Sequence, residues 1–310
     1  MNDAAPVLAR FDYPVADTET RLAILSDLHL AVEKTGTWRM SHRTKERLKH
    51  AVASINSDRE IDGVLFLGDL VQDGTVAQYR AFDEIVTGLD VPLLAVPGNH
   101  DLIATESRPS VSLAEFEDRY TPDGLPYHTR IGGLDVLALN SNRSTHGSLA
   151  ESYAGRLSAE TLDWLEGKLA TVESPLVAVH HNLPGTRSLL FDSEDDLPVP
   201  VGSPDFENTD EFLRVLREGG SPLVITGHLH FPAVSTAQGV REFTLPSLGP
   251  YPCSYTVLDV DRDGTTARMR SVAEYSDRVE AFVQGQSHCR VLLAAAQLSG
   301  LPLVDDCRDS

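Results

Sequence analysis

Acidic, amide and histidine side chains recur where short apolar segments of this sequence end. Each of these groups can coordinate a cation, through a carboxylate oxygen, an amide oxygen or an imidazole nitrogen. The motifs in question are Ser26-Asp27-Leu28-His29, Gly68-Asp69, Pro97-Gly98-Asn99-His100-Asp101, His180-His181 and Gly227-His228-Leu229-His230. One such motif arises often by chance, but five in order at the ends of apolar runs favour a metal site.

The spacing within the first three motifs indicates how their side chains converge. In an extended chain, Asp27 and His29 project from the same side, so that a carboxylate and an imidazole can bind one cation. Asp69 follows a glycine, which permits close backbone approach, and its two oxygens can bridge two cations. Asn99 supplies a neutral oxygen, which limits the negative charge that an anionic substrate meets. His100 is then free for another role.

Histidines are concentrated in these motifs. Six of the eleven lie there, and His180-His181 and His228-Leu229-His230 each end an apolar run. Open α/β sheets assemble their sites at the carboxyl ends of their strands, which is where these residues are expected. Four histidines that lack such a setting are predicted to lie on the surface: His42, His50, His128 and His288.

A framework of alternating strands and helices is needed to position the motifs. Apolar runs predict buried strands at residues 22–26, 63–67, 93–96, 136–140, 176–180 and 223–226. Helical spacing of apolar residues predicts helices between them, at residues 42–57, 76–88, 112–119, 158–170 and 208–218. This alternation predicts a mainly parallel layer covered by helices.

The last third of the sequence has a different pattern. Residues 241–245, 255–260 and 265–272 are typical of strands joined by turns, so that a second sheet of antiparallel character is expected. From Ala281 onward one terminal helix is predicted, and Gly300 and Pro302 break it. The expected organisation is a catalytic domain over residues 1–280 and a helical C-terminal extension over residues 281–310.

The composition is that of a soluble globular protein with an acidic surface. The formal net charge of −20 repels polyanions, which argues against nucleic-acid binding. The three cysteines lack the paired spacing of a zinc site or a disulfide framework. The N-terminus lacks the basic start and apolar run of a signal peptide, and no stretch approaches the roughly 20 apolar residues of a membrane span. We therefore expect a cytoplasmic protein without a membrane partner. The oligomeric state stays open, a homo-oligomer included.

Taken in order, the motifs D-x-H, G-D, G-N-H-D, H-H and G-H-x-H resemble the calcineurin-like metallophosphoesterase superfamily over residues 22–230. The resemblance implies an α/β protein built as a four-layer α/β/β/α sandwich with a centre of two divalent metal ions. The implied ligands are Asp27, His29 and His230 for one metal and Asn99, His180 and His228 for the other, with Asp69 bridging the two. The mixed nitrogen and oxygen donors suit manganese, iron or zinc.

Within the superfamily, the sequence is most similar to the bacterial branch of cyclic-nucleotide and glycerophosphodiester phosphodiesterases. That branch commonly has H-H-P-P where this chain has His180-His181-Asn182-Leu183-Pro184. The resemblance implies a small phosphoester substrate, hydrolysed by a metal-bridging hydroxide near Asp69. His100 would face the substrate, and would protonate the leaving oxygen or stabilise its charge.

Alternative functions stay open at this point. A phosphomonoesterase would use the same metal ligands, because the groups that select the substrate lie on loops. A nuclease would need a basic groove, and the only basic cluster here runs from Arg39 to Lys49. A non-catalytic scaffold would be expected to lose His100 or several ligands, whereas every position is filled.

Four further features have two interpretations each. The segment 182–206 follows a predicted ligand and is either a lid over the site or a solvated surface excursion. Asp101 either orients His100 or a metal ligand, or it caps a helix. Arg143 and His146 follow another strand, and either reach a phosphate or lie on the surface.

Overall fold

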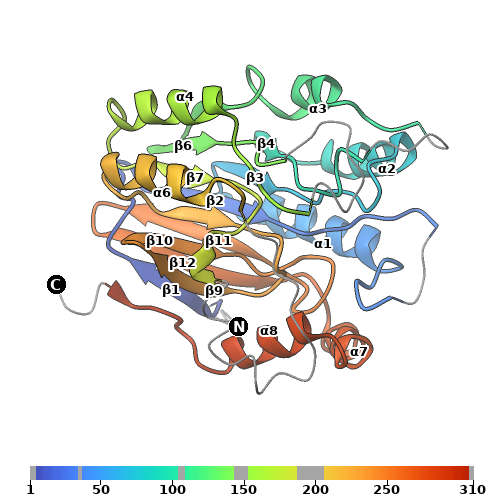
Figure 1. The fold of residues 1–310 in the computed structure, drawn as a ribbon. Helices are drawn as coiled ribbons and strands as arrows, with labels where there is room; N and C mark the ends of the chain where they lie inside the picture. The colour runs from blue at the N-terminus through green and yellow to red at the C-terminus, as the bar shows by residue number, and fades with distance from the viewer. Residues whose placement is uncertain (1–4, 34–36, 104–108, 143–152, 187–205, 307–310) are drawn as a thin grey trace.

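The computed structural model is a sandwich of two six-stranded sheets with helices on both outer faces (Figure 1). It describes residues 5–33, 37–103, 109–142, 153–186 and 206–306. The first sheet has the order β1-β12-β11-β2-β3-β4. Its strands are β1 (Val7–Phe11), β2 (Thr20–Leu25), β3 (Gly63–Leu67), β4 (Leu93–Val96), β11 (Ser254–Asp261) and β12 (Gly264–Ser271).

The second sheet has the order β5-β6-β7-β8-β10-β9. Its strands are β5 (Tyr127–Ile131), β6 (Leu134–Ala138), β7 (Leu176–Ala178), β8 (Val224–Thr226), β9 (Ala233–Ala237) and β10 (Val240–Thr244). Each sheet contains neighbouring parallel strands: β2, β3 and β4 in the first, and β6, β7, β8 and β10 in the second. The carboxyl ends of these parallel strands therefore form one edge of the sandwich.

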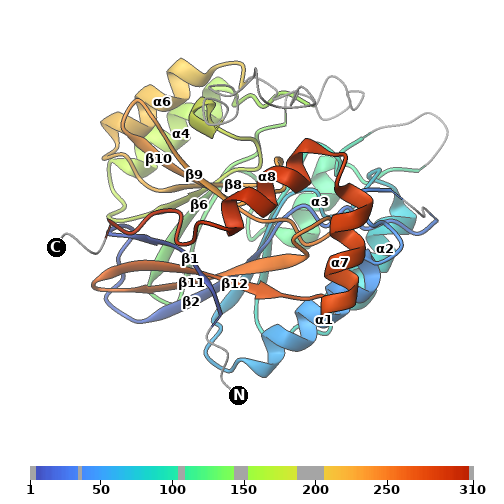
Figure 2. The ribbon, with the colours of Figure 1, turned by 90° about the horizontal axis from the view of Figure 1, so that it is seen from below.

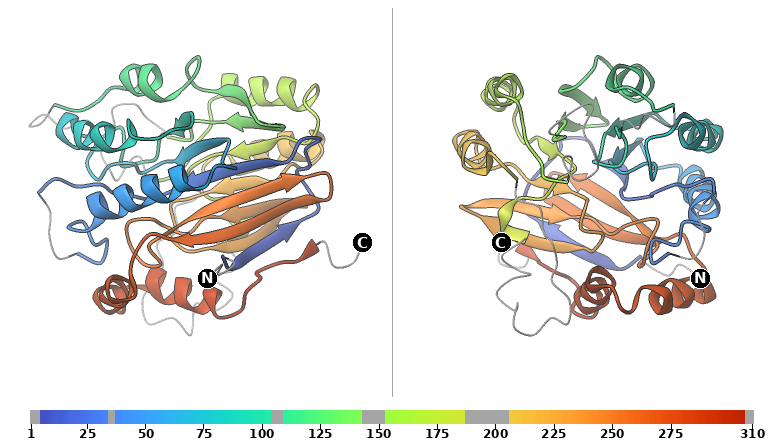
Figure 3. Two further views of the ribbon diagram at one scale, coloured as in Figure 1. Left: turned by 180° about the vertical axis from the view of Figure 1, so that it is seen from behind. Right: turned by 45° about the vertical axis from the view of Figure 1, so that its right-hand side comes forward.

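The helices cover the two outer faces (Figure 3). On the first sheet lie α1 (Thr44–Ser57), α2 (Val76–Val86) and α3 (Leu113–Tyr120), whereas α4 (Ala159–Leu169) and α6 (Thr209–Glu218) cover the second. Three of them start at polar caps: the side chains of Thr75, Ser112 and Ser158 accept hydrogen bonds from backbone amides in the first turn of α2, α3 and α4.

Three apolar clusters separate these layers. One lies between the first sheet and its helices, a second between the two sheets, and a third between the second sheet and α4 and α6. The strand β3 is buried along its whole length because it faces helices on one side and the other sheet on the opposite side. This arrangement confirms the four-layer α/β/β/α sandwich.

The predicted distribution of strands between sheets is wrong in one respect. The late strands do not form a separate antiparallel sheet. Instead, β11 pairs antiparallel with β2 in the first sheet, and β10 pairs parallel with β8 in the second. The late strands thus extend the first sheet beyond β2 and the second sheet beyond β8. The strands β1, β5 and β9 were not predicted.

The C-terminal part contains two helices, not the single one predicted from Ala281. They are α7 (Tyr275–Gly285) and α8 (Cys289–Leu298), and they lie on the underside of the molecule (Figure 2). Helix α7 begins earlier and crosses the expected boundary between residues 280 and 281. Helix α8 packs through Cys289 and Ala294 against the segment after β8. The last helices are therefore in contact with the loops that follow the parallel strands.

Candidate metal centre

The motifs found in the sequence meet at the carboxyl edge of the parallel strands. Asp27, His29, Asp69 and His230 offer ligand atoms within 4.8 Å of one another, and so do Asp69, His180 and His228. All six side chains are almost fully buried. Asp69 belongs to both sets, which we call the first and the second cluster.

In the first cluster, two imidazoles and two carboxylates face one another. The Nε2 atoms of His29 and His230 are 3.0 Å apart. His29 Nε2 lies 3.5 Å from Asp69 Oδ2, and His230 Nε2 lies 3.2 Å from Asp27 Oδ1. Ser26 Oγ donates to Asp27 Oδ2 at 2.7 Å and fixes the orientation of that carboxylate.

The second cluster contains one carboxylate and a neutral amide oxygen. His180 Nε2 lies 3.5 Å from Asp69 Oδ2, and His228 Nδ1 lies 3.0 Å from Asn99 Oδ1. His180 Nδ1 donates to the backbone oxygen of Leu67 at 2.9 Å. In the neutral ring, this bond leaves the lone pair on Nε2, as is common for a metal-binding histidine. The structure thus brings together all seven residues of the predicted ligand set.

The backbone at these residues differs from the extended chain that the sequence suggested. Strand β2 ends at Leu25, and five residues of the set have positive φ angles, which are Asp27 (53°), His29 (49°), Asp69 (52°), His228 (64°) and His230 (65°). Side chains other than glycine rarely adopt this conformation, and it is concentrated at functional sites. The side chains converge through tight left-handed turns rather than along one face of a strand.

Glycines beside the ligands permit this close packing. Gly68 has a φ of +83°, and a Cβ atom there would lie 2.3 Å from His180 Nδ1. A Cβ atom at Gly98 would lie 2.3 Å from Asp69 Oδ1. A larger residue at either position would displace a member of the clusters.

The donor atoms fit divalent cations. Within the described residues, Nε2 of His180, the ring nitrogen that faces Asp69, is buried without a hydrogen-bond partner. Leaving a buried polar atom unpaired costs about 1–3 kcal/mol, which is unusual unless a ligand uses it. Burial lowers the pKa of His29 and His228 well below the usual value and that of His230 to about 4. These three imidazoles are therefore neutral, as metal binding requires.

Asp69 and His180 form an ionic pair in the absence of a cation. Burial would lower the pKa of His180, but Asp69 outweighs this effect and raises it to about 9. Burial would raise the pKa of Asp69, but His180 and His100 hold it well below its ordinary value. A cation bound between the two residues would replace the proton on His180.

His100 lies beside the clusters with a fixed ring. Its Nδ1 donates to the backbone oxygen of Gln72 at 2.7 Å, and its ring meets the ring of His29 edge to face, with centroids 4.6 Å apart. Its backbone amide donates to Asp69 Oδ1 at 2.9 Å. Burial lowers the pKa of His100, and Asp69 opposes that effect. With Nδ1 bonded to Gln72, Nε2 is the nitrogen that can meet a substrate.

Asp101 joins two of the loops that carry the ligands. Its carboxylate accepts hydrogen bonds from the amides of Val71 at 3.1 Å and Gly98 at 2.8 Å. Burial, reinforced by Asp69, raises the pKa of Asp101 to about 7. These hydrogen bonds go to the backbone amides of Val71 and Gly98 rather than to His100 or a ligand side chain, and no described helix begins at Asp101. The observed role is therefore to brace the loops around the clusters, and the predicted orientation of His100 or a ligand stays a prediction.

The departure from H-H-P-P has a structural counterpart. Asn182 Nδ2 lies 3.0 Å from Glu242 Oε1 and 2.7 Å from Thr226 Oγ1, and the amide of Leu183 donates to the same Glu242 oxygen at 3.0 Å. Burial raises the pKa of Glu242, whereas its hydroxyl and amide donors lower it. This buried polar network ties the turn after His180 to β8 and β10. The sequence analysis did not identify Glu242.

A second group of side chains lies beside the clusters without any strand-end motif. The Trp38 ring is stacked on His288 with centroids 3.7 Å apart, and lies 5.3 Å from His230. Arg290 donates to the backbone oxygen of His228 at 2.8 Å and to Tyr153 Oη at 2.9 Å. The prediction of His288 as a surface residue is wrong. It is partly buried because α8 folds back over the loop after β8.

The predicted basic cluster does not form a positive groove. Arg43 pairs with Glu280 at 2.8 Å, and Arg47 is buried against Asp277, so that α7 neutralises both. His42 and His50 are exposed, as predicted. His128 is partly buried and lies 2.8 Å from Asp135.

Several predictions concern residues outside the described part of the chain. Arg143 and His146 belong there, and so does most of the segment 182–206, of which the structure describes residues 182–186 and 206. Their proposed roles in substrate binding stay predictions. Among the described residues, no helix is both long and apolar enough to span a membrane.

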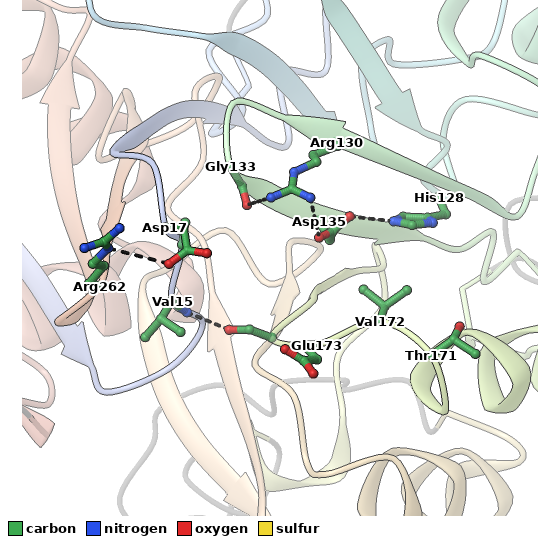
Figure 4. A pocket seen from close by; sticks show the side chains of 12 residues that line it. Val15, Asp17, His128, Arg130, Gly133, Asp135, Thr171, Val172, Glu173 and Arg262 are labelled. Carbon is green, nitrogen blue, oxygen red and sulfur yellow. Dashed lines mark hydrogen bonds and ion pairs between the residues drawn. The ribbon is translucent and has the colours of Figure 1, made fainter.

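A pocket lies at the opposite edge of the sandwich, where the parallel strands begin (Figure 4). It is lined by segments that precede β2, β6 and β7 and by the turn between β11 and β12. Its polar groups pair with one another, as in the contact between His128 and Asp135. None of the predicted ligands lines this pocket.

Comparison with known proteins gives a consistent assignment. The family model described as calcineurin-like phosphoesterase matches residues 20–232. A probable cyclic nucleotide phosphodiesterase of Synechococcus sp. is 30% identical over 252 residues, which cover 81% of this chain and 86% of that protein. A cAMP/cGMP dual specificity phosphodiesterase of Mycobacterium tuberculosis is 28% identical over 264 residues, which cover 82% of this chain and 74% of that protein.

Among solved structures, the chain is similar to GAP50, the anchor in the inner membrane complex of Plasmodium. The alignment has a TM-score of 0.51 and 12% sequence identity, and covers 89% of this chain and 96% of that one. At this identity the likeness concerns the fold alone.

Proposed function

The chain belongs to the calcineurin-like phosphoesterase family, and on that premise we propose that it hydrolyses a small phosphodiester of the cyclic-nucleotide or glycerophosphodiester type. Membership of the family and the two Asp/His clusters make it a metal-dependent phosphoric ester hydrolase. The observation that carries the metal-dependent chemistry is the position of Asp69 in both clusters. A binuclear centre requires a shared carboxylate, because one residue that contributes to both clusters would fix the distance between two bound cations.

The proposed ligands follow the clusters. Asp27, His29 and His230 would hold one cation, and Asn99, His180 and His228 the other, with Asp69 between them. The first cluster has one more carboxylate than the second, whose remaining oxygen donor is the neutral amide of Asn99. Manganese, iron and zinc all suit this mixture of nitrogen and oxygen donors.

Bound cations would neutralise phosphoryl oxygens and lower the pKa of a water molecule towards neutrality. The residues of the chain supply the rest of the chemistry. Asp69 stays ionised and orients both clusters. His100, fixed through Nδ1 by Gln72, would present Nε2 to the leaving oxygen, to which it would donate a proton or a hydrogen bond. Asp101 would keep the loops of Asp69 and His100 at a constant separation.

Two observations favour a small diester over other phosphoesters. Two relatives that align over about four fifths of the chain are named as cyclic nucleotide phosphodiesterases. The acidic net charge and the pairing of Arg43 and Arg47 with α7 disfavour a nucleic-acid substrate. A phosphomonoesterase is the alternative, because the same clusters would serve it. A cytoplasmic location stays a prediction.

The test is a substrate screen with defined metal content. The protein would be stripped of metal, reconstituted separately with Mn²⁺, Fe²⁺ or Zn²⁺, and assayed with cyclic nucleotides, glycerophosphodiesters and phosphomonoesters. We expect the highest kcat/KM with a diester, and no activity for the Asp69→Ala variant in any condition. A clear preference for monoesters would replace the diester proposal with the alternative. Full activity in the metal-stripped protein would contradict the metal-dependent site itself.

A further inference from the structure

Arg39 is a cation beside the clusters that has no counter-ion of its own. It follows β2 in the segment that leads to α1, and it is partly buried. Its Nε is buried without a hydrogen-bond partner, and no described residue forms an ion pair with its guanidinium. A buried and unpaired donor atom on a charged group is costly, so that this arrangement calls for an explanation.

The electrostatic surroundings place Arg39 next to the reacting centre. Burial is the main cause that lowers the pKa of Arg39, Arg290 lowers it further, and Asp69 and Asp27 raise it. An arginine nevertheless stays protonated at neutral pH. Arg39 is therefore close enough to a second guanidinium and to the two carboxylates of the first cluster to be affected by all three, and the Trp38 ring that it contacts lies 5.3 Å from His230.

Neighbouring aromatic rings hold Arg39 in this position. Its Cζ atom lies over the Trp38 ring, 4.9 Å from the centroid. His288 stacks on the same indole at 3.7 Å, so that Trp38 contacts both the N-cap residue of α8 and the guanidinium. The C-terminal part of the chain thus helps to position a residue at the metal centre, although it lies more than fifty residues beyond the last ligand.

The two guanidiniums differ in their freedom to bind a ligand. Arg290 is buried and donates to the backbone of His228 and to Tyr153, which commits it to the protein. Among the described residues, Arg39 has no such bond. When Asp27 and Asp69 serve as metal ligands, they cannot also neutralise Arg39. An anion is then the group that would balance its charge.

We propose that Arg39 binds a non-bridging phosphoryl oxygen of the substrate, and that Trp38 and His288 position it for that contact. This inference rests on the proposed function, since it places a phosphoester at the clusters. A planar guanidinium matches two oxygens of a phosphoryl group, so that Arg39 would orient the substrate as well as attract it.

The experiment compares three variants with the wild type after reconstitution with Mn²⁺. Arg39→Gln removes the charge, Arg39→Lys keeps it without the planar fork, and Arg43→Gln removes an equal charge four residues further along the chain. Metal content is measured first, and we expect all four proteins to bind equal amounts. Inorganic phosphate is then titrated by calorimetry, which needs no turnover.

We expect Arg39→Gln to weaken phosphate binding by about 10- to 100-fold, the range for a lost hydrogen bond to a charged group. Arg39→Lys should retain part of the affinity, and Arg43→Gln should stay within about 2-fold of the wild type. For a diester that the wild type hydrolyses, Arg39→Gln should raise KM more than it lowers kcat. A further variant, His288→Ala, should raise KM in the same sense by a smaller factor.

Three results would overturn the inference. They are unchanged phosphate affinity in Arg39→Gln, an equal loss in Arg43→Gln, and loss of metal from Arg39→Gln, which would assign Arg39 to the cation site instead. If Arg39→Gln does not fold, Arg39→Lys serves as the test. Wild-type phosphate affinity and an unchanged KM in Arg39→Lys would also contradict the inference, because the planar fork of the guanidinium would then be irrelevant. If the wild type hydrolyses no diester but Arg39→Gln still loses phosphate affinity, the inference stands and the proposed substrate class fails.

Discussion

The two ends of the same parallel strands satisfy their polar groups in opposite ways. At the carboxyl edge, Nε2 of His180 faces Asp69 and is buried without a hydrogen-bond partner among the described residues, and five residues of the clusters have positive φ angles. At the amino edge, the polar groups around the pocket pair with one another (Figure 4). Asp135 lies 2.8 Å from His128, Arg262 lies 3.5 Å from Asp17, and Ser174 Oγ accepts from the amide of Val15 at 2.7 Å.

This difference separates the edge of the sandwich that serves the chemistry from the edge that serves only the stability of the fold. Polar groups that find their hydrogen-bond partners within the protein add modest stability. Buried polar groups without a partner lower the stability of the fold unless a ligand binds to them. The backbone strain at the carboxyl edge has the same meaning, because strained residues persist where the surroundings hold them for a function. We therefore expect substitutions at the carboxyl edge to change activity and those at the amino edge to change stability only.

The largest effect is expected for Asp69→Ala. This residue belongs to both clusters, so that its removal should separate both proposed cations, whereas His230→Ala removes a ligand from one cluster only. We expect kcat/KM at the background level for Asp69→Ala, residual activity for His230→Ala, and reduced metal content in both. Metal analysis by mass spectrometry and a diester assay measure these quantities. Two tightly held metals with near-normal turnover in Asp69→Ala would contradict the site.

His100→Ala should separate binding from chemistry. The side chain adjoins the first cluster but belongs to neither, so that the variant should keep its metals. Turnover should fall by about 10²–10⁴, the usual range for a positioned acid or base. The control is Gln72→Ala, which keeps the imidazole and the backbone oxygen that orients it, and should lose less activity. Loss of metal from His100→Ala would show that this residue is a ligand.

The leaving group distinguishes the two roles of His100. An alkoxide is strongly basic and needs a proton as the bond breaks, whereas a nitrophenolate departs without one. We expect His100→Ala to lower kcat/KM for an alkyl phosphoester more than for a nitrophenyl ester, by about 10-fold or more. Equal losses for both esters would indicate that His100 stabilises charge on the phosphoryl group instead.

The parallel strands and the ligand residues that follow them could be predicted from the sequence, because the apolar run of a strand and the polar motif at its end are both local features. A buried run such as β3 is apolar throughout, and the ligands follow directly at its end. The conformation of Asp27 and His29 was predicted wrongly, since an alternating pattern cannot show where a strand stops and a left-handed turn begins. Helix α7 was missed because only Ala281 and Gly285 of its residues are buried, so that no apolar stripe marks it.

The residues that meet only in three dimensions were beyond prediction from sequence. Trp38 and Arg39 precede α1, and His288 and Arg290 lie at the start of α8, so that nothing in their spacing indicates contact. The same holds for Glu242, which approaches Asn182 across neighbouring strands of the second sheet. A side chain that depends on the tertiary fold for its partner leaves no periodic signal in the sequence.

The smallest effect is expected for Asp135→Asn at the amino edge, and it tests the comparison most strictly. Asp135 Oδ1 lies 2.8 Å from His128 Nε2, and the two side chains are 19% and 26% exposed. A pair this close to solvent contributes about 0–1 kcal/mol, so that Tm should fall by about 1–3 °C or less. The diester kcat/KM and the metal content should equal those of the wild type. Asp135 lies near the start of β6, at the end of the strand opposite the metal centre. Thermal unfolding followed by circular dichroism, together with the diester assay, measures both quantities on one preparation. A loss of activity without a loss of stability would mean that the pocket at the amino edge communicates with the metal centre, and the division between the two edges would then fail.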